Sequence, residues 1–145
     1  MQVIQILREK GHDVIALSSE ATLLEAARLL AHKRIGALVV KNAAGALAGI
    51  LSERDVVRAV AAEGMPALAR PVSATMTRQV ATCTELDTVE ELMEMMTQGR
   101  FRHVPVLDGD NRLCGLVSIG DVVKMHIEET MREAASLRQY ITAAG

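Results

Sequence analysis

The chain has 145 residues, half of them apolar, and its formal net charge is −2. This length fits one ordinary domain or two very small units with a shared core, and the apolar content is enough to bury a compact interior. Lys and Arg are scattered among Asp and Glu, and a single Phe and a single Tyr offer no stacking platform for bases. We therefore expect no nucleic-acid partner.

The sequence also argues against a membrane protein, a zinc protein or a redox protein. The longest apolar stretches, such as Ala37–Val40 and Ala46–Leu51, are far shorter than the roughly 20 residues of a membrane span. The chain starts with MQVIQILREKGHD, which carries charges where a secretion signal needs an apolar run. Cys83 and Cys114 lack metal-binding or redox spacing, so we expect two small apolar side chains. The prediction is a cytoplasmic protein without a metal or a catalytic cofactor.

An internal repeat dominates the sequence. A shift of 66 positions aligns Val14–Arg58 with Val80–Lys124 without a gap. The identical pairs include Gly49 and Gly115, Ser52 and Ser118, and Asp55 and Asp121. We therefore expect two copies of one structural unit.

The first copy reads in chain order as strand, helix, strand, strand, helix. Residues 1–10 precede it as a short helix ended by Gly11. Thr22-x-x-Glu25 is typical of a capping box, and the helix after it carries an apolar stripe. Residues 37–40 and 47–51 predict two hairpin strands, and a second helix is expected from near Ser52.

The second copy repeats this order after a linker rich in Gly and Pro. Thr88-x-x-Glu91 predicts a capping box, residues 103–107 and 113–117 predict strands, and a helix is expected from near Ser118. Residues 122–141 predict one long helix, whose apolar stripe beyond the repeat favours a partner helix from a second copy of the chain. The Met residues in the helix after Thr88 are interpreted as core and not as a metal site.

One such three-stranded sheet cannot cover its own apolar faces, so the two units are expected to pack against each other. The predicted fold is α/β of the α+β type, with two units of β-α-β-β-α order in a pseudo-symmetric pair and an extra C-terminal helix. The predicted boundaries are 1–64 for the N-terminal segment and first unit, 65–79 for the linker, and 80–145 for the second unit with its helix.

Two copies of a short signature carry a resemblance to a known family. They read GILSERD at 49–55 and GLVSIGD at 115–121, each followed by Val-Val, and the second unit also contains RHVPV at 102–106. This combination resembles the CBS (cystathionine-β-synthase) domain family, in the form of a stand-alone tandem pair, or Bateman module. The resemblance implies a regulatory module that binds an adenosyl ligand and catalyses nothing.

The same resemblance implies two nucleotide pockets. Asp55 and Asp121 would accept hydrogen bonds from ribose hydroxyls, while Ser52 and Ser118 lie at helix starts that favour phosphate. The remaining residues implied for the first pocket are Ile50, Arg54, Val80, Ala81, Phe101, Arg102, His103 and Pro105. Those implied for the second are Val14, Ile15, Ile35, Val39, Leu116 and Gly120.

The two pockets are not expected to be equivalent. Arg102 and His103 would meet phosphates in the first pocket, whereas their counterparts in the repeat are Gly36 and Ala37. We therefore expect the second pocket to lack positive charge and the Asp55 pocket to hold the phosphorylated end of a ligand, helped by Arg54. AMP, ADP, ATP, NAD and S-adenosylmethionine all remain open as ligands.

Structural alternatives stand beside each of these assignments. Ser-x-x-Asp is also a plain capping box, and both roles can hold at once. Arg102 and His103 also fit a solvated strand edge. His12, His32 and His126 are interpreted as surface residues. The alternative function is a ligand-free dimerisation or protein-interaction module; in either case we expect a homodimer and an unknown downstream protein.

Overall fold

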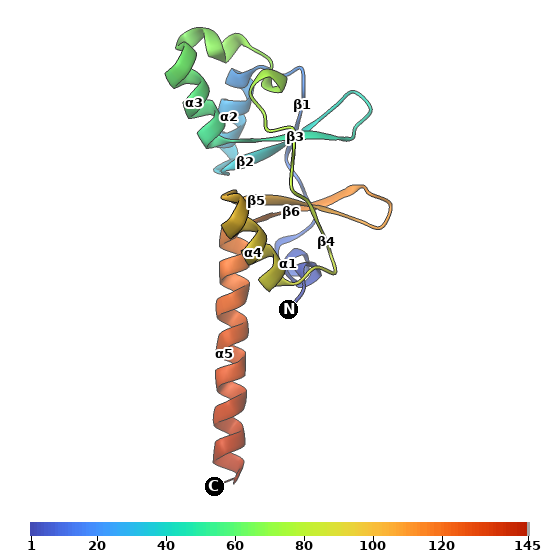
Figure 1. Cartoon of the computed structure of the whole chain (residues 1–145), viewed down its shortest axis with the longest axis vertical. Coiled ribbons are helices and arrows are strands. Elements are labelled where there is room, and N and C mark those ends of the chain that lie inside the picture. Colours follow the sequence, from blue (N-terminus) through green and yellow to red (C-terminus); the bar gives the residue numbers. More distant parts are fainter. Residues whose placement is uncertain (145) are drawn as a thin grey trace.

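The computed structural model describes residues 1–144 and shows two stacked units, each built on a three-stranded sheet (Figure 1). In each sheet the first strand is parallel to the second, and the second is antiparallel to the third. The strands are β1 (Ala16–Ser18), β2 (Ala37–Lys41) and β3 (Leu47–Ser52), then β4 (Cys83–Thr84), β5 (His103–Leu107) and β6 (Leu113–Ser118). The predicted mixed α/β fold with two tandem units is confirmed.

The strand registers repeat with the same shift of 66 residues. Val39 faces Ile50 in the first sheet, and Pro105 faces Leu116 in the second. A β-bulge also recurs, after Val40 and after Val106. The repeat in the sequence is therefore a repeat of backbone geometry.

Helices α2 (Leu23–Lys33) and α4 (Val89–Gly99) begin at the predicted threonines. Thr22 Oγ1 accepts a hydrogen bond from the Glu25 amide at 3.2 Å, and Thr88 forms the equivalent bond. The return contact of a full capping box, from the glutamate carboxylate, is not formed at either helix within residues 1–144. The first amide of each helix donates to a carbonyl that is distant in sequence, Arg70 for α2 and Met1 for α4.

Each of the two segments that precede a unit in the chain packs against the other unit. Helix α1 (Val3–Lys10) buries Val3, Ile6 and Leu7 in the core of the second unit. The predicted linker forms two 3₁₀ turns, η1 (Met65–Ala69) and η2 (Val72–Ala74), and contributes Ala67, Val72 and Met76 to the core of the first unit. The domain boundaries stay a prediction, but neither segment is a free connector.

The last helices differ in length. Helix α3 spans Glu53–Glu63, whereas α5 runs from Ile119 to Ala144 and projects beyond the paired units (Figure 1). Val122 and Met125 are buried near its start, and later apolar residues such as Met131 and Leu137 are exposed. Within residues 1–144 no helix has the length and apolar content that a membrane span requires.

Candidate functional site

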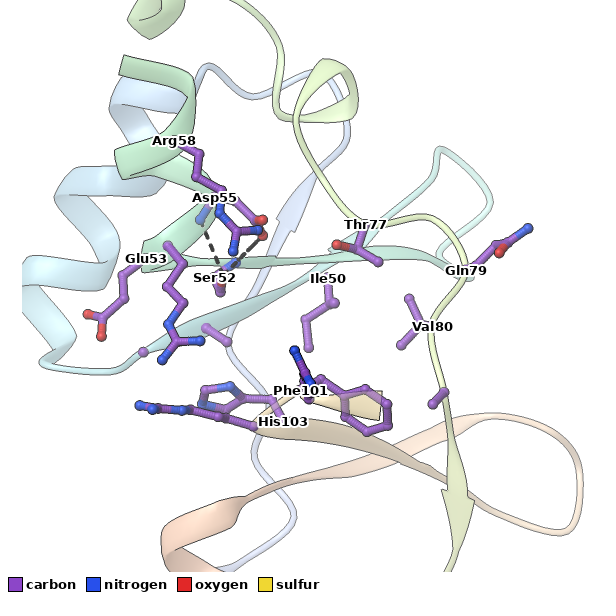
Figure 2. A pocket seen from close by; sticks show the side chains of 16 residues that line it. Ile50, Ser52, Glu53, Asp55, Arg58, Thr77, Gln79, Val80, Phe101 and His103 are labelled. Carbon is purple, nitrogen blue, oxygen red and sulfur yellow. Dashed lines mark hydrogen bonds between the residues drawn. The ribbon is translucent and has the colours of Figure 1, made fainter. Parts of the chain in front are cut away.

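The first candidate pocket begins where strand β3 runs directly into helix α3. Ser52 Oγ accepts a hydrogen bond from the Asp55 amide at 3.3 Å, and Asp55 Oδ2 accepts from the Ser52 amide at 2.8 Å (Figure 2). The Ser52 hydroxyl also donates to Asp55 Oδ2 at 3.1 Å. The capping alternative is therefore realised, and it fixes the carboxylate at a helix start.

A cavity of about 220 Å³ lies between the two units at this point. Figure 2 shows Ser52, Asp55 and Arg58 on the first unit, with Phe101 and His103 on the facing unit. The connecting segment before β4 closes a third side. The predicted residues that line this cavity are Ile50, Ser52, Arg54, Asp55, Val80, Ala81, Phe101, Arg102 and His103.

The cavity carries more positive charge than the sequence indicated. Arg54, Arg58, Arg100 and Arg102 all line it, with Glu53 and Asp55 as the acidic side chains. Guanidinium groups at one cavity are suited to phosphate oxygens. Their positive charge makes this side of the cavity chemically suited to an anion.

His103 lies half-buried at the boundary between the units and lines a second cavity as well. Burial lowers the pKa of His103, and the positive charges of Lys10 and Arg102 lower it further, against the opposing effects of Asp121 and Glu53. The imidazole is therefore neutral at pH 7, with a nitrogen able to take up a proton when an anion approaches.

The second candidate pocket is a separate cavity of about 340 Å³. The predicted residues that line it are Val14, Ile15, Ile35, Leu116 and Ser118. Asp121 does not line it, because Lys10 Nζ lies 2.7 Å from Asp121 Oδ2 and also donates to the Leu116 carbonyl at 2.7 Å. The two pockets therefore differ at the carboxylate that was expected to hold ribose.

The environment of Asp121 reflects that ion pair. Its capping contacts match those of Asp55: the Ser118 amide donates to Asp121 Oδ2 at 2.9 Å, and the Asp121 amide donates to Ser118 Oγ at 3.2 Å. Burial alone would raise the pKa of Asp121, but the hydrogen bonds from Lys10 and Ser118 and the Lys10 charge lower it below its ordinary value. Asp121 is therefore an ionised, paired carboxylate.

Besides Asp121, three of the predicted residues do not line either pocket. Val39 and Pro105 are buried in the central strands β2 and β5, where neighbouring strands and packing cover them. Gly120 lies exposed in the first turn of α5, outside both linings. The expectation that the second pocket lacks positive charge is also wrong, because Lys10 and Arg34 line it beside Gly36 and Ala37.

Several lining residues of the first pocket were missed from the sequence. Arg58 follows Arg54 by four positions and so shares a helix face with it, a spacing that was available as a signal. Arg100 follows α4 as its C-cap with a φ of 57°, a left-handed conformation that an arginine does not indicate in the sequence. Thr77 and Gln79 belong to the segment that was treated as a linker.

Comparisons with known proteins indicate the family of this chain. The chain is 32% identical over 147 residues to the CBS domain-containing protein CBSX3, mitochondrial, of Arabidopsis thaliana, covering 96% of this chain and 71% of that protein. The cytoplasmic location expected from the sequence stays a prediction.

Solved structures give the same result. The CBS-domain containing protein ATU1752 from Agrobacterium tumefaciens superposes with a TM-score of 0.82 at 47% identity, over 85% of this chain and 91% of that one. The CBS domain protein PAE2072 from Pyrobaculum aerophilum, complexed with AMP, gives 0.75 at 28% identity, over 83% and 89%. The family model of the CBS domain matches residues 3–62 and 72–128. With two such matches in tandem, the chain belongs to the CBS domain family.

Proposed function

We propose that this CBS pair is a regulatory module that binds an adenine nucleotide in the cavity holding Asp55. The observation that carries the proposal is the composition of that single cavity. A carboxylate that forms no salt bridge within residues 1–144, four arginines and an apolar side made by Ile50, Val80 and Phe101 face one space between the units. AMP bound to a relative of the same fold supports this choice of ligand class.

The bound nucleotide is assigned to three regions of the cavity. Asp55 accepts hydrogen bonds from the ribose hydroxyls, because Ser52 occupies Oδ2 and leaves further lone pairs on the carboxylate. The base lies against Ile50 and Phe101, with backbone groups at Val80 and Ala81 along its edge. The phosphates point to the arginines.

Such a ligand would act by linkage. Its ribose contacts come from the first unit, whereas Phe101, Arg102 and His103 belong to the second. A ligand that touches both units stabilises one relative arrangement of them over others, and a partner that distinguishes those arrangements then responds to nucleotide. The module regulates and does not itself catalyse.

Calorimetric titration with AMP, ADP, ATP, NAD and S-adenosylmethionine tests the proposal. Asp55→Ala should abolish measurable binding of the ligand that wild-type protein prefers. Asp121→Ala is the matched control, because it removes the same kind of capping contact from the other unit. Equal loss in both variants, or no binding to any of the five compounds, would contradict the assignment.

Comparing the affinities of adenosine and AMP separates the contribution of the ribose contacts from that of the phosphate contacts. If the arginines contact phosphate, AMP should bind at least about tenfold more tightly than adenosine, since charge-assisted hydrogen bonds contribute about 1.5–3 kcal/mol. Arg102→Ala should reduce this difference and leave adenosine binding unchanged. Identical AMP affinity in the variant would place the phosphate elsewhere.

A second function, self-association through α5, is favoured by a separate observation. Val123, Ile127 and Leu137 are 44%, 50% and 60% exposed on this helix. With Thr130, Ala134 and Ile141 they follow a heptad pattern, and in a parallel pair of helices Glu133 would face Arg138 of the second copy. This charge match favours a parallel homodimer.

Light scattering tests the homodimer. Ile127→Lys with Leu137→Lys should convert a dimer into a monomer, while Gln139→Lys, on the opposite side of the heptad, should not. A monomeric wild-type protein would exclude this function. A dimer without any nucleotide binding would favour the interaction module over the sensor.

A further inference from the structure

Lys10, the last residue of α1, lies at the position that distinguishes the second pocket from the first. Its ammonium group donates to Asp121 Oδ2 and to the Leu116 carbonyl, both at 2.7 Å. The helix that carries it is anchored by the buried side chains of Val3 and Leu7. A basic residue in the last turn of a helix is also favoured by the helix dipole.

The backbone explains why a lysine is needed there. In the first unit the Ile50 carbonyl, which corresponds to that of Leu116, accepts a hydrogen bond from the Thr77 amide at 2.9 Å. The residue equivalent to Thr77 is Gly11, but its amide closes α1 by donating to the Leu7 carbonyl at 2.7 Å. Lys10 therefore supplies the donor that the backbone cannot.

This contact also divides the space of the second pocket. Lys10 lines the cavity that contains Val14 and Ile15, and it lines a separate cavity of about 240 Å³ that contains Asp121. In the first unit Asp55 shares one cavity with their counterparts Val80 and Ala81. The side chain of Lys10 thus stands between the carboxylate and the surfaces on which a base would lie.

We infer that Lys10 is a latch that closes the second pocket to adenosyl ligands, so that each chain binds one nucleotide tightly. The inference rests on the proposed function of the first pocket. A ligand enters the second pocket only in the fraction of molecules in which Lys10 has released both acceptors, and its apparent affinity falls by that fraction. Lys10 is therefore a residue that determines which of two homologous pockets is used.

The number of AMP molecules bound per chain tests the latch. Equilibrium dialysis should give one for wild-type protein and two for Lys10→Met, in which the lysine becomes the residue found at the equivalent position 76. Lys33→Met, an exposed lysine outside both pockets, is the control and should remain at one. Two equal sites in wild-type protein, or one site in Lys10→Met, would overturn the inference.

A second variant guards against a folding defect. Lys10→Gln keeps a donor for the Leu116 carbonyl and removes the charge, and it should give a second site at least about tenfold tighter than in wild-type protein. Thermal unfolding of each variant verifies that it is folded. Weaker binding at the second site in Lys10→Gln would mean that Lys10 contacts ligand, which contradicts a latch.

A double variant separates failure of the latch from failure of the first pocket. Asp55→Ala should bind no AMP, Asp55→Ala with Lys10→Met should bind one, and adding Asp121→Ala should remove it again. If wild-type protein binds none, the first-pocket assignment fails, and the latch then requires Lys10→Met to bind one. If wild-type protein binds one and the Asp55→Ala, Lys10→Met variant binds none, only the latch fails.

Discussion

The two units have the same strands in the same register but are packed against chain segments of different structure. Beside the third strand of the first unit lies an extended segment, whose Thr77 exchanges two backbone hydrogen bonds with Ile50 at 2.9 and 3.0 Å. The second unit is packed against helix α1, whose closing Gly11 has a φ of 100° and no amide left for Leu116. Duplication thus preserved both sheets, while the segment packed against each unit determined which polar group reaches each pocket.

The sharpest test of this comparison is a methyl group added to the central glycine of each third strand. A Cβ at Gly49 would lie 2.6 Å from the Thr77 carbonyl oxygen, whereas a Cβ at Gly115 would lie 2.6 Å from the end of the Leu7 side chain. A backbone atom yields less readily than a leucine methyl. Gly49→Ala should cost about 3 kcal/mol of unfolding free energy and Gly115→Ala about 1 kcal/mol.

Denaturation with urea measures both glycine variants. Equal losses would mean that the extended segment before β4 moves as easily as a leucine side chain. That result would mean that the segment before β4, which closes the third side of the first pocket, is not rigid. Gly109, whose added Cβ would meet nothing within 4 Å, provides the control substitution.

Substitution of the equivalent arginines at the ends of α2 and α4 should give the next largest effect. Arg34 and Arg100 have φ values of 55° and 57°, so glycine at either position should stabilise the fold by about 0.5–1 kcal/mol. Arg100 lines the first pocket, whereas Arg34 lines the second. Arg100→Gly should therefore weaken AMP binding about fivefold, and Arg34→Gly should not.

Calorimetry of the two arginine variants measures affinity, and thermal unfolding measures stability. Similar AMP affinities in both would indicate that the charge of Arg100 is too exposed to contribute. Weaker binding in Arg34→Gly alone would reverse the assignment of the nucleotide to the first pocket.

The sequence predicted the frame of the molecule because its signals are local. Periodicity, threonine caps and hairpin turns each depend on a few neighbouring residues, and they correctly indicated two copies of strand, helix, strand, strand, helix. The Ser52 and Asp55 contact was equally predictable, since it closes over three residues. A contact between residues so close in sequence depends little on how the rest of the chain packs.

Features that depend on distant partners were not predictable. Lys10 meets Asp121 across 111 positions of sequence, and the repeat gave no hint because the equivalent residue, Met76, is apolar. The charge of the second pocket was misjudged for the same reason, since Lys10 and Arg34 enter it from a helix and a helix end outside the strand that was considered. The packing of α1 brings Lys10 to the pocket, and the end of α2 brings Arg34.

Because His103 lines both pockets, we expect the stability and the AMP affinity of the protein to depend on pH, with an effect of intermediate size. Its pKa in the folded protein lies below the ordinary value of 6.5, so the free imidazole is neutral at pH 7 and the unfolded chain binds the proton more readily. This group therefore lowers stability as the pH falls below about 6.5. A bound phosphate reverses the preference by raising the pKa of His103.

AMP binding should consequently be accompanied by proton uptake. The affinity for AMP should rise about threefold between pH 8 and pH 6, which is less than the tenfold change that a shift of one pKa unit would give. His103→Gln corrects for the titration of the phosphate itself and should remove only the contribution of the imidazole. Calorimetry in buffers of different ionisation enthalpy measures the uptake. A pH profile identical to that of wild-type protein would place the phosphate away from His103.

The smallest predicted difference concerns the two cysteines, both of which lie in the second unit. The equivalent positions of the first unit are Leu17 and Ala48, so Cys114→Ala copies the first unit and removes only a weak contact of 3.4 Å with Glu85. Its cost should be within about 0.5 kcal/mol. Burial raises the pKa of Cys83 to about 12, and burial with the Glu85 contact raises that of Cys114 to about 11.

Thiolates are therefore scarce in both positions at pH 7, and alkylation should be slow in the folded protein. Cys114 is the more exposed thiol and should react first, with a rate that rises about tenfold per pH unit below its pKa. Mass spectrometry of iodoacetamide-treated protein measures the order. Faster labelling of Cys83 would show that β4 opens on the timescale of the reaction, and hence that the wall of the first pocket formed by the residues just before it is mobile.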